Sequence, residues 1–466
     1  MKRKIFSVML SVLLLTATGC QSSASEQVVK APIYRTEEVY KYTFDALGED
    51  VMPIGGYYAP FGGYGLNGEY IESTITDEVY KGIADSGLNF IIASTIDYSR
   101  DHENAVLSYE LAEKHNVMLF MRDSYLFCLD SPYKEAIESD KFAKRLKEHK
   151  KYSSFAGLYG RDEPFGFEFP YLKQVSERFY DVVGADNSTA LYFNSLSYQC
   201  SDGMLTNGWG DGNMEESWTL DIYLDEYFKA TKGAKFYTYD LYPFINGGNF
   251  RSTYFENLQL VKDRTAEEKL PFFTFVQGGG KYDNQEEYDI PDEGMMWWSI
   301  STSLAYGAKG YQFFTYTHPE VFFNGESGTC GFIGRYAEKT ERWYYAQNIN
   351  RHTAAIDHVL LNSAHMGIIA NGDSPAPIPE KGRLKSFRAL KSVEGDDSIV
   401  GCFDYKGRTA YYAVNNSTTK DKAKVVLNFD NRYAYEVIQN ANSYSLKGKS
   451  LTLTLAPGEG ALVVLQ

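Results

Sequence analysis

The sequence predicts an α/β fold in which a (β/α)8 TIM barrel is followed by a smaller antiparallel β-sandwich domain. Two observations predict the barrel. Eight apolar, strand-like runs recur through the first three-quarters of the 466-residue chain, and helical patterns separate them. A third observation, a change to short alternating strands near the C-terminus, predicts the second domain.

The strand-like runs are continuous rather than alternating, as strands covered on both faces require. They recur at intervals of roughly 30–40 residues, which is typical of a barrel of ordinary size. The runs are 52–58, 89–94, 116–121, 155–160, 190–194, 235–239, 271–276 and 310–314. A doubly wound open sheet is the alternative, but no glycine-rich phosphate fingerprint supports it. The barrel is therefore expected to span residues 46–360.

Helical patterns fill the connections between these runs. Thr76 is suited to cap a helix that continues through Ala84, and Gly87 lies where a left-handed residue would end it. Further helices are expected over 101–114, 171–183, 220–231, 295–306 and 340–360.

The chain changes character over residues 361–466. The proline-rich segment 375–382 breaks regular structure, and turns are expected at 406–407 and 457–458. Alternating strands are expected over 398–404, 409–414, 423–429 and 451–455. Because no cluster of acids or histidines appears here, this β-sandwich is interpreted as an accessory module packed on the barrel.

Residues 1–20 are interpreted as a lipoprotein signal peptide. Three basic residues at 2–4 precede an apolar run over 5–15 that is too short to span a membrane comfortably. The small residues before Cys20 resemble a bacterial lipobox, in which that cysteine is lipidated, although Ala17 replaces the usual leucine. The alternative is an ordinary secretory signal cleaved nearby. Residues 21–45 would form a tether and lead-in.

These features predict an exported cell-envelope lipoprotein at the bacterial surface or in the periplasm, with a lipid anchor at Cys20 as its contact with the membrane. The net charge of −15 becomes −18 once the three basic residues of the signal are removed. Such an acidic chain argues against a nucleic-acid partner. The 15% aromatic content, with 38 tyrosines, suits a sugar-binding cleft.

Neither a metal nor a cofactor is expected from the distribution of cysteine and histidine. The four cysteines after Cys20 have no CxxC spacing, and the seven histidines form no HxH or HExxH motif.

The chemistry is expected at the end of the fourth strand. The apolar run that begins at residue 155 ends in Asp162, Glu163 and Pro164, and the proline prevents the strand from continuing. In a parallel barrel the carboxyl ends of the strands form the mouth where active sites lie. Other strand ends place polar groups at the same mouth, namely Asp97, Arg122, Asp240, Tyr242, Gln277 and His318.

This arrangement resembles the clan A glycoside hydrolases, which are TIM barrels with an appended β-sandwich. In that clan the acid/base glutamate ends strand four as Asn-Glu or Asn-Glu-Pro, and Asp162-Glu163-Pro164 is similar, with aspartate for asparagine. The stretches 239–244 and 305–310 also resemble those of bacterial glycosidase-like lipoproteins. The resemblance implies a carbohydrate substrate, an oligo- or polysaccharide, with Glu163 as the general acid/base.

One position departs from the clan. Its nucleophile is a glutamate that ends strand seven, where this sequence has Gln277, and an amide is a poor nucleophile. Asp240, an acid such as Glu293 from the loop after strand seven, or an amide of the substrate could take the role. Asp240 is preferred because a strand end positions an acid better than a loop does. Arg161 is expected to pair with one of these acids or to point outward.

The leading hypothesis is thus an exported glycoside hydrolase with Glu163 and Asp240 as catalytic residues. Its rival is a non-catalytic glycan-binding surface lipoprotein that kept the cleft and lost the nucleophile. The residues expected to bind substrate are Asp97, Arg122, Tyr159, Asp162, Tyr242, Gln277, His318, Trp209 and Trp218. For the two tryptophans, which lie in a glycine-rich polar loop, local packing is the alternative to stacking on a sugar.

Overall fold

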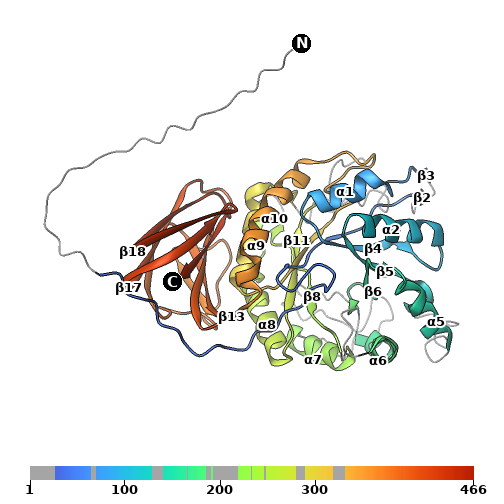
Figure 1. Cartoon of the computed structure of the whole chain (residues 1–466), viewed down its shortest axis with the longest axis horizontal. Helices are drawn as coiled ribbons and strands as arrows, with labels where there is room; N and C mark the ends of the chain where they lie inside the picture. Colours follow the sequence, from blue (N-terminus) through green and yellow to red (C-terminus); the bar gives the residue numbers. More distant parts are fainter. Residues whose placement is uncertain are drawn as a thin grey trace, which may run out of the picture.

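A computed structural model describes most of the chain (Figure 1). The described residues are 27–64, 70–127, 140–164, 166–184, 190–192, 219–231, 233–245, 248–279, 289–317 and 331–466. No helix among them is both long enough and apolar enough to cross a membrane.

An eight-stranded parallel sheet forms the first part of the fold, and the predicted barrel is confirmed as a TIM-barrel-like, curled α/β sheet. Neighbouring strands follow the order β7-β6-β5-β4-β1-β12-β11-β8. The described residues record no pairing between β7 and β8 at the two ends of this order. The strands are β1 (Ile54–Tyr57), β4 (Phe90–Asp97), β5 (Met118–Arg122), β6 (Phe155–Tyr159), β7 (Ala190–Tyr192), β8 (Tyr237–Tyr239), β11 (Phe272–Gln277) and β12 (Tyr311–Phe314).

Helices follow the strands and cover the outside of the sheet (Figure 1). Thr76 caps the first of them as predicted, because its hydroxyl accepts a hydrogen bond from the Val79 amide. The helices are α1 (Asp77–Asp85), α2 (His102–Lys114), α3 (Ser124–Phe127), α5 (Asp140–His149), η1 (Gly166–Glu168), α6 (Phe169–Val183), α7 (Leu220–Ala230), α8 (Tyr254–Glu267), α9 (Glu293–Ala305) and α10 (Glu341–Leu360). Helices α5 and α8 were not predicted from the sequence.

Short two-stranded ladders lie in the loops between the main strands. The first joins β2 (Gly63–Tyr64) to β3 (Tyr70–Ile71), and the second joins β9 (Phe244–Ile245) to β10 (Asn249–Phe250). The second ladder follows β8 directly, so it forms part of the loop that leaves the sixth barrel strand.

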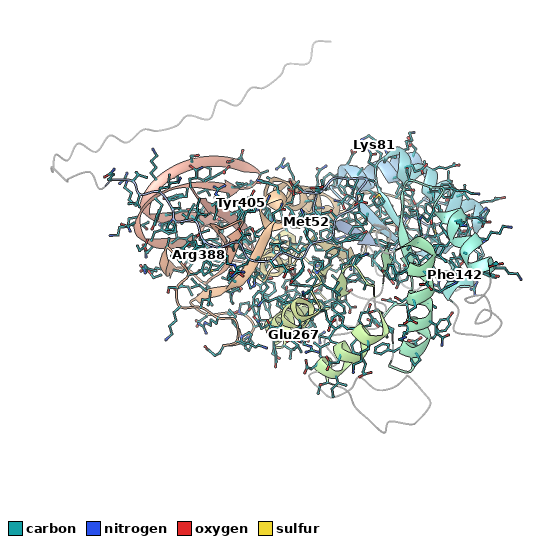
Figure 2. All side chains as sticks on the ribbon, turned by 60° about the horizontal axis from the view of Figure 1, so that its bottom comes forward. Met52, Lys81, Phe142, Glu267, Arg388 and Tyr405 are labelled. Atoms are coloured by element: carbon teal, nitrogen blue, oxygen red, sulfur yellow. The ribbon has the colours of Figure 1, made fainter. Side chains whose placement is uncertain are left out.

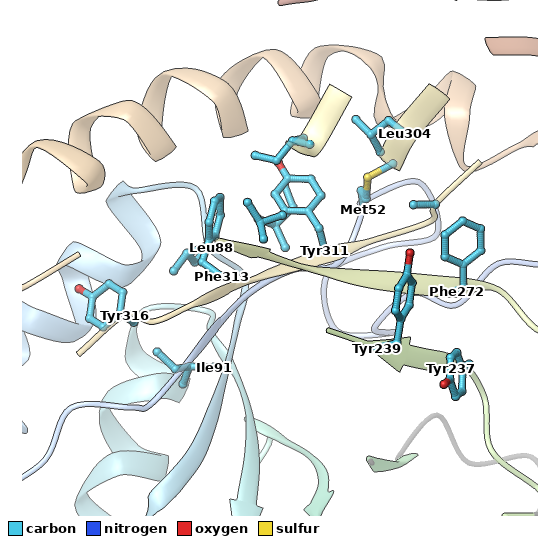
Figure 3. Close-up of a cluster of buried hydrophobic side chains, with 14 of the residues drawn as sticks. Met52, Leu88, Ile91, Tyr237, Tyr239, Phe272, Leu304, Tyr311, Phe313 and Tyr316 are labelled. Atoms are coloured by element: carbon cyan, nitrogen blue, oxygen red, sulfur yellow. The ribbon is translucent and has the colours of Figure 1, made fainter. Parts of the chain in front are cut away.

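Two clusters of buried side chains lie on the two faces of the sheet. The larger cluster lies between the strands and the helices, and Figure 3 shows part of it, with Leu88, Tyr311 and Leu304 among the labelled residues. The smaller cluster includes the aromatic rings of Phe90, Phe120, Phe236 and Phe273. Its rings lie 4.5–6.2 Å apart in stacked and edge-on pairs, the spacing that aromatic cores favour.

The described part of the predicted lead-in packs against the C-terminal domain and the barrel. Val29 donates a backbone hydrogen bond to Arg432 over 2.8 Å, and Tyr34 donates one to Gly407 over 2.8 Å. Further on, Tyr42 packs against Phe236 with ring centroids 5.0 Å apart. This segment therefore runs along the C-terminal domain before it joins the barrel core, as the dark blue trace in Figure 1 shows.

The C-terminal domain is one antiparallel sheet of seven strands that curls over itself, which confirms the predicted antiparallel β domain. Its central strand β17 changes register between Asn428 and Tyr433, so its first half pairs with β14 and its second half with β19. A separate apolar cluster fills the space inside. The strands are β13 (Ser363–Asn371), β14 (Leu390–Gly395), β15 (Ser398–Tyr405), β16 (Arg408–Asn415), β17 (Ala423–Gln439), β18 (Asn442–Leu455) and β19 (Gly460–Leu465).

Side chains fill the space between the barrel and the β domain (Figure 2). Helix α9 packs on strands β15 and β16, and the indole N–H of Trp298 donates to the side-chain oxygen of Asn416 over 2.9 Å. A Cβ added to Gly458 would lie 2.3 Å from the Trp298 amide nitrogen, so this contact requires glycine. The two parts are therefore joined by a close-packed interface.

Candidate active site

Glu163 lies four residues beyond the end of β6, at the mouth of the barrel. Its φ of 45° is in the left-handed region, which residues with a Cβ rarely adopt. Two contacts stabilise the surrounding turn. The Arg161 guanidinium pairs with the buried Glu168 carboxylate at 2.8 Å, and the Tyr223 hydroxyl donates to the Pro164 carbonyl over 2.8 Å. Strained backbone held in this way is typical of functional sites.

Asp240 follows the last residue of β8 and is 6% exposed. The side chains of Asp240 and Glu163 share a hydrogen bond, although they come from the fourth and sixth barrel strands. One of two carboxyl groups in such contact must carry a proton, because two carboxylates repel each other. The structure thus brings together the two residues that were predicted to be catalytic.

Burial and the neighbouring charges change the acidity of this pair. Burial, followed by the charge of Asp162, raises the pKa of Glu163 to about 7, and the hydrogen bond from Asp240 and the charge of Arg161 only partly oppose the rise. Burial and the charges of Glu163 and Asp162 raise the pKa of Asp240 well above its usual range. Near neutral pH the pair therefore retains a proton that it can transfer.

Asp162 is held by a chain of two hydroxyl groups. The Tyr57 hydroxyl donates to the Asp162 carboxylate over 2.8 Å, and it lies 2.6 Å from the Tyr159 hydroxyl. Since the single Tyr57 proton is directed to Asp162, Tyr159 donates to Tyr57. Both phenols are buried. Tyr159 contacts Tyr57, which in turn orients Asp162, and the predicted contact of Tyr159 with substrate stays a prediction.

Aromatic rings line the neighbourhood of the acids. Tyr58 is close to them, because the charges of Asp162 and Glu163 add to burial in raising the pKa of its phenol. Its ring centroid lies 5.7 Å from that of Phe314, which lies 5.6 Å from that of Tyr242. The sequence predicted Tyr242 at this mouth of the barrel, but it did not predict Tyr57, Tyr58 or Phe314 there. Their signal in the sequence is their position at the ends of the first and eighth strands.

Gln277 ends strand β11 as predicted, but its amide binds the backbone of the neighbouring loops. Its Nε2 donates to the carbonyls of Phe244 and Asp289 over 3.2 and 2.6 Å, and its Oε1 accepts from the Phe244 amide over 3.2 Å. The side chain is 2% exposed. These contacts give it a structural task, and its predicted contact with substrate stays a prediction.

Asp97 and Arg122 lie together at the ends of β4 and β5. The Asp97 carboxylate accepts hydrogen bonds from Ser99 and Ser124, and the Arg122 guanidinium lies 3.9 Å from it. Burial opposes ionisation of Asp97, but these hydrogen bonds outweigh burial and lower its pKa. Arg122 is 49% exposed at its side chain, so it remains accessible to a ligand.

The other predicted site residues, His318, Trp209, Trp218 and Cys20, lie outside the described residues. The described part of the chain contains no group of three or more histidine, cysteine, aspartate and glutamate side chains arranged to hold a metal ion.

No model of a known protein family matches the sequence, and no curated protein is significantly similar to it. Solved structures are similar in fold. A protein described as "Glycoside hydrolase" has 11% identity and a TM-score of 0.54, and the alignment covers 94% of this chain and 99% of that one. An Anoxybacillus α-amylase has 11% identity and a TM-score of 0.48, with 89% and 98% covered.

A β-galactosidase from Marinomonas ef1 is similar over 68% of this chain at 8% identity, with a TM-score of 0.46. The present chain spans 63% of the length of that enzyme. At such identities the likeness extends to the fold, a TIM-like barrel with a C-terminal antiparallel β domain.

Proposed function

We propose that the protein is an exported glycoside hydrolase acting on oligo- or polysaccharides, with Glu163 as general acid/base and Asp240 as the second carboxylate. The observation that carries the proposal is the hydrogen-bonded, partly protonated pair of acids at the mouth of the barrel. The fold of this protein is similar to that of a solved structure described as a glycoside hydrolase. This likeness supports the proposed reaction class by analogy alone.

Glu163 is suited to protonate the leaving glycosidic oxygen. A general acid works best when its pKa lies near the working pH, and the pKa of Glu163 is raised to about 7. Asp162 contributes to this value through its charge and is itself oriented by the Tyr57 hydroxyl. Loss of the proton to the leaving group leaves a Glu163 carboxylate, which is then able to deprotonate an incoming water molecule.

Asp240 takes the second role in its ionised form, with the proton of the pair on Glu163, and then stabilises the positive charge that develops at the anomeric carbon or attacks that carbon. In glycoside hydrolases, two catalytic carboxyl groups about 5 Å apart retain the configuration of the anomeric carbon. Groups roughly 6.5–9.5 Å apart leave room for a water molecule between them and invert that configuration. Because Glu163 and Asp240 share a direct hydrogen bond, the separation of their carboxyl groups is closer to the shorter of these two distances. We therefore propose a retaining reaction, in which the bound substrate separates the two acids.

The test is hydrolysis of neutral glycans by the wild-type protein and by Glu163→Gln and Asp240→Asn. Activity that is lost in both variants, and restored to Asp240→Asn by azide as a substitute nucleophile, supports the proposal. Unchanged hydrolysis in Glu163→Gln overturns it. Glycan binding with no hydrolysis by the wild type supports the alternative, a non-catalytic glycan-binding lipoprotein.

Export and lipidation at Cys20 form a separate part of the proposal, which rests on the basic, apolar and small residues that precede this cysteine. Metabolic labelling with a radioactive fatty acid tests it. The label should appear in the wild type and be absent from Cys20→Ala, and an unlabelled wild type overturns it.

A further inference from the structure

The lead-in crosses one end of the β domain before it reaches the barrel. Val29 donates a backbone hydrogen bond to Arg432 over 2.8 Å, and Ala31 donates one to Gln466 over 3.1 Å. In Figure 1 the dark blue trace starts beside β17, at the part of the β domain that lies away from the barrel. The preceding chain, which includes Cys20, is therefore joined to this end of the β domain.

The lead-in then enters the barrel at the end opposite the mouth. The ring of Tyr42 packs on Phe236 and Phe273, with centroids 5.0 and 6.5 Å apart. Phe236 immediately precedes β8, and Phe273 is the second residue of β11, so both lie where barrel strands begin. Glu163 and Asp240 instead follow the ends of β6 and β8. The Glu163–Asp240 pair therefore faces away from the point where the lead-in meets the barrel.

The proposed lipidation at Cys20 would hold this end of the β domain near a bilayer. Cys20 precedes Val28 by eight residues, and a fully extended chain of that length spans at most about 29 Å. A lipid anchor on Cys20 therefore brings the membrane close to the surface that the lead-in crosses.

Exposed cations surround the lead-in on this surface. Val29 forms a bridge with Tyr433, whose partner on β18 is Gly448, between two lysines. The Tyr34 amide donates to the Gly407 carbonyl over 2.8 Å, in a turn that a third lysine begins. We call the six exposed basic side chains here the basic surface: Lys30, Arg35, Lys406, Arg432, Lys447 and Lys449.

Acids in the same strands are occupied by other groups. Asp404 is buried and pairs with Arg388, and Asp430 accepts a hydrogen bond from the Tyr433 hydroxyl over 2.8 Å. These two carboxylates therefore do little to neutralise the basic surface.

The two parts of the protein also differ in their overall charge. Residues 361–466 contain 13 lysines and arginines against 10 aspartates and glutamates, a net charge of +3. Residues 46–360 contain 27 against 47, a net charge of −20. An anionic surface therefore repels the barrel, and it attracts the end of the β domain where the basic surface lies.

Exposed apolar side chains lie among these cations. Val28 and Val29 are 37% and 41% exposed, and Ile33 is 70% exposed. Binding at the surface of a bilayer increases with the apolar area that is buried there and with the attraction of basic residues to anionic lipids. The lead-in and the basic surface together supply both contributions.

We propose that the basic surface docks on anionic lipid headgroups and, together with an acyl chain on Cys20, holds the β domain against the bilayer. A lipid chain and a basic patch act together in stable anchoring of this kind. The acidic barrel is then held further from the lipids, and its mouth stays open to the medium. The inference rests on the proposed export of the protein and does not depend on glycan hydrolysis.

The test uses residues 21–466 without lipid, a chain that contains every described residue. Sedimentation with vesicles of phosphatidylglycerol and phosphatidylcholine should show binding at about 0.05 M salt that weakens at about 0.5 M. Vesicles of phosphatidylcholine alone should bind little. The combined variant Arg432→Gln, Lys447→Gln and Lys449→Gln should weaken binding at least about tenfold, because each basic residue near anionic lipid contributes about fivefold.

The combined variant Lys420→Gln, Lys422→Gln and Lys424→Gln is the matched control. These exposed lysines follow Thr418, which packs against Gly294 of α9, so they lie beside the barrel rather than beside the lead-in. The control removes the same charge from the same domain and should weaken vesicle binding much less.

The inference is overturned if the anionic vesicles do not bind, if the two combined variants bind them equally, or if soluble polyglutamate binds and the vesicles do not. Vesicle binding by a chain that hydrolyses no glycan would contradict the proposed hydrolase and leave this surface standing. Normal hydrolysis without vesicle binding would do the reverse.

Discussion

The carboxyl groups of Glu163 and Asp240 share a hydrogen bond across the mouth of the barrel, although one follows the fourth strand and the other the sixth. Burial is the largest cause of the raised pKa of each, and the charge of Asp162 raises both further. Such a pair costs folding free energy and is retained where its proton is used. We therefore expect this pair to be the centre of the site.

Glu163→Gln should lower kcat for glycan hydrolysis by about 10²–10⁴-fold, because loss of a general acid typically has this effect. Glutamine retains the size of the side chain, so the affinity for the same glycan should change little. Release of reducing sugar and calorimetric binding measure the two quantities. Glu177→Gln, on the exposed face of α6, is the control. A variant that loses binding and activity together would indicate a misfolded site.

The pH dependence of kcat/KM should show an alkaline limb near pH 7, because Glu163 must be protonated and its pKa is about 7. The charge of Asp162 raises that pKa, so Asp162→Asn should lower it and shift the limb to lower pH. Asp181→Asn, on the exposed side of α6, should leave the profile in place. A limb that stays fixed in Asp162→Asn would show that another group controls the rate.

The same pKa predicts that Glu163 destabilises the fold at neutral and alkaline pH. Between its usual pKa of 4.5 and about 7, the unfolded chain has lost the proton that the folded chain retains. Stability is therefore lost as the pH rises through this window, by up to about 3 kcal/mol. Glu163→Gln should be stabilising at about pH 8 and nearly neutral at about pH 4 in urea denaturation. Equal effects at both pH values would contradict this linkage.

The position of this pair was predictable because strand ends carry a clear signal. Asp162, Glu163 and Pro164 follow an apolar run, and Asp240 follows another, so the barrel rule places all of them at one mouth. The capped helix after Thr76 was predictable for a similar, local reason. Contacts between strands leave no such local signal in the sequence.

Three features of the site depend on such contacts. Arg161 pairs with Glu168 because η1 returns that residue to the turn. Tyr57 and Tyr58 look like core residues of the first strand, and only the assembled barrel brings them next to Asp162. From the sequence, Gln277 could be interpreted only as the substitute for a nucleophile. Its structural role was not visible, because its hydrogen bonds are formed with loops that are distant in sequence.

Tyr57→Phe should reduce kcat by about tenfold, since it removes the hydroxyl that donates to Asp162 and leaves the ring contacts in place. The effect should reach Glu163 through Asp162, so the alkaline limb of the pH profile should also move. Phe275→Leu, which alters a ring packed 5.7 Å from Tyr57 without touching an acid, is a packing control. A lower melting temperature with an unchanged profile would assign Tyr57 to stability alone.

Gln277→Glu would introduce the residue that clan A glycoside hydrolases carry at the end of strand seven, and we expect it to destabilise the protein without raising its activity. The Gln277 amide donates to two backbone carbonyls, and a carboxylate donates to none. The substitution would leave those carbonyls without this donor and bury a charge at a position 2% exposed. Each loss costs about 1–3 kcal/mol.

Urea denaturation and hydrolysis assays of Gln277→Glu together decide the role of this position. Gln277→Met serves as the partner variant, because it removes the same hydrogen bonds without adding a charge. Both variants should be destabilised, and Gln277→Glu more so as the pH rises and its carboxyl ionises. A gain in hydrolysis in Gln277→Glu would instead mean that strand seven can still supply the nucleophile, and Asp240 would lose that role.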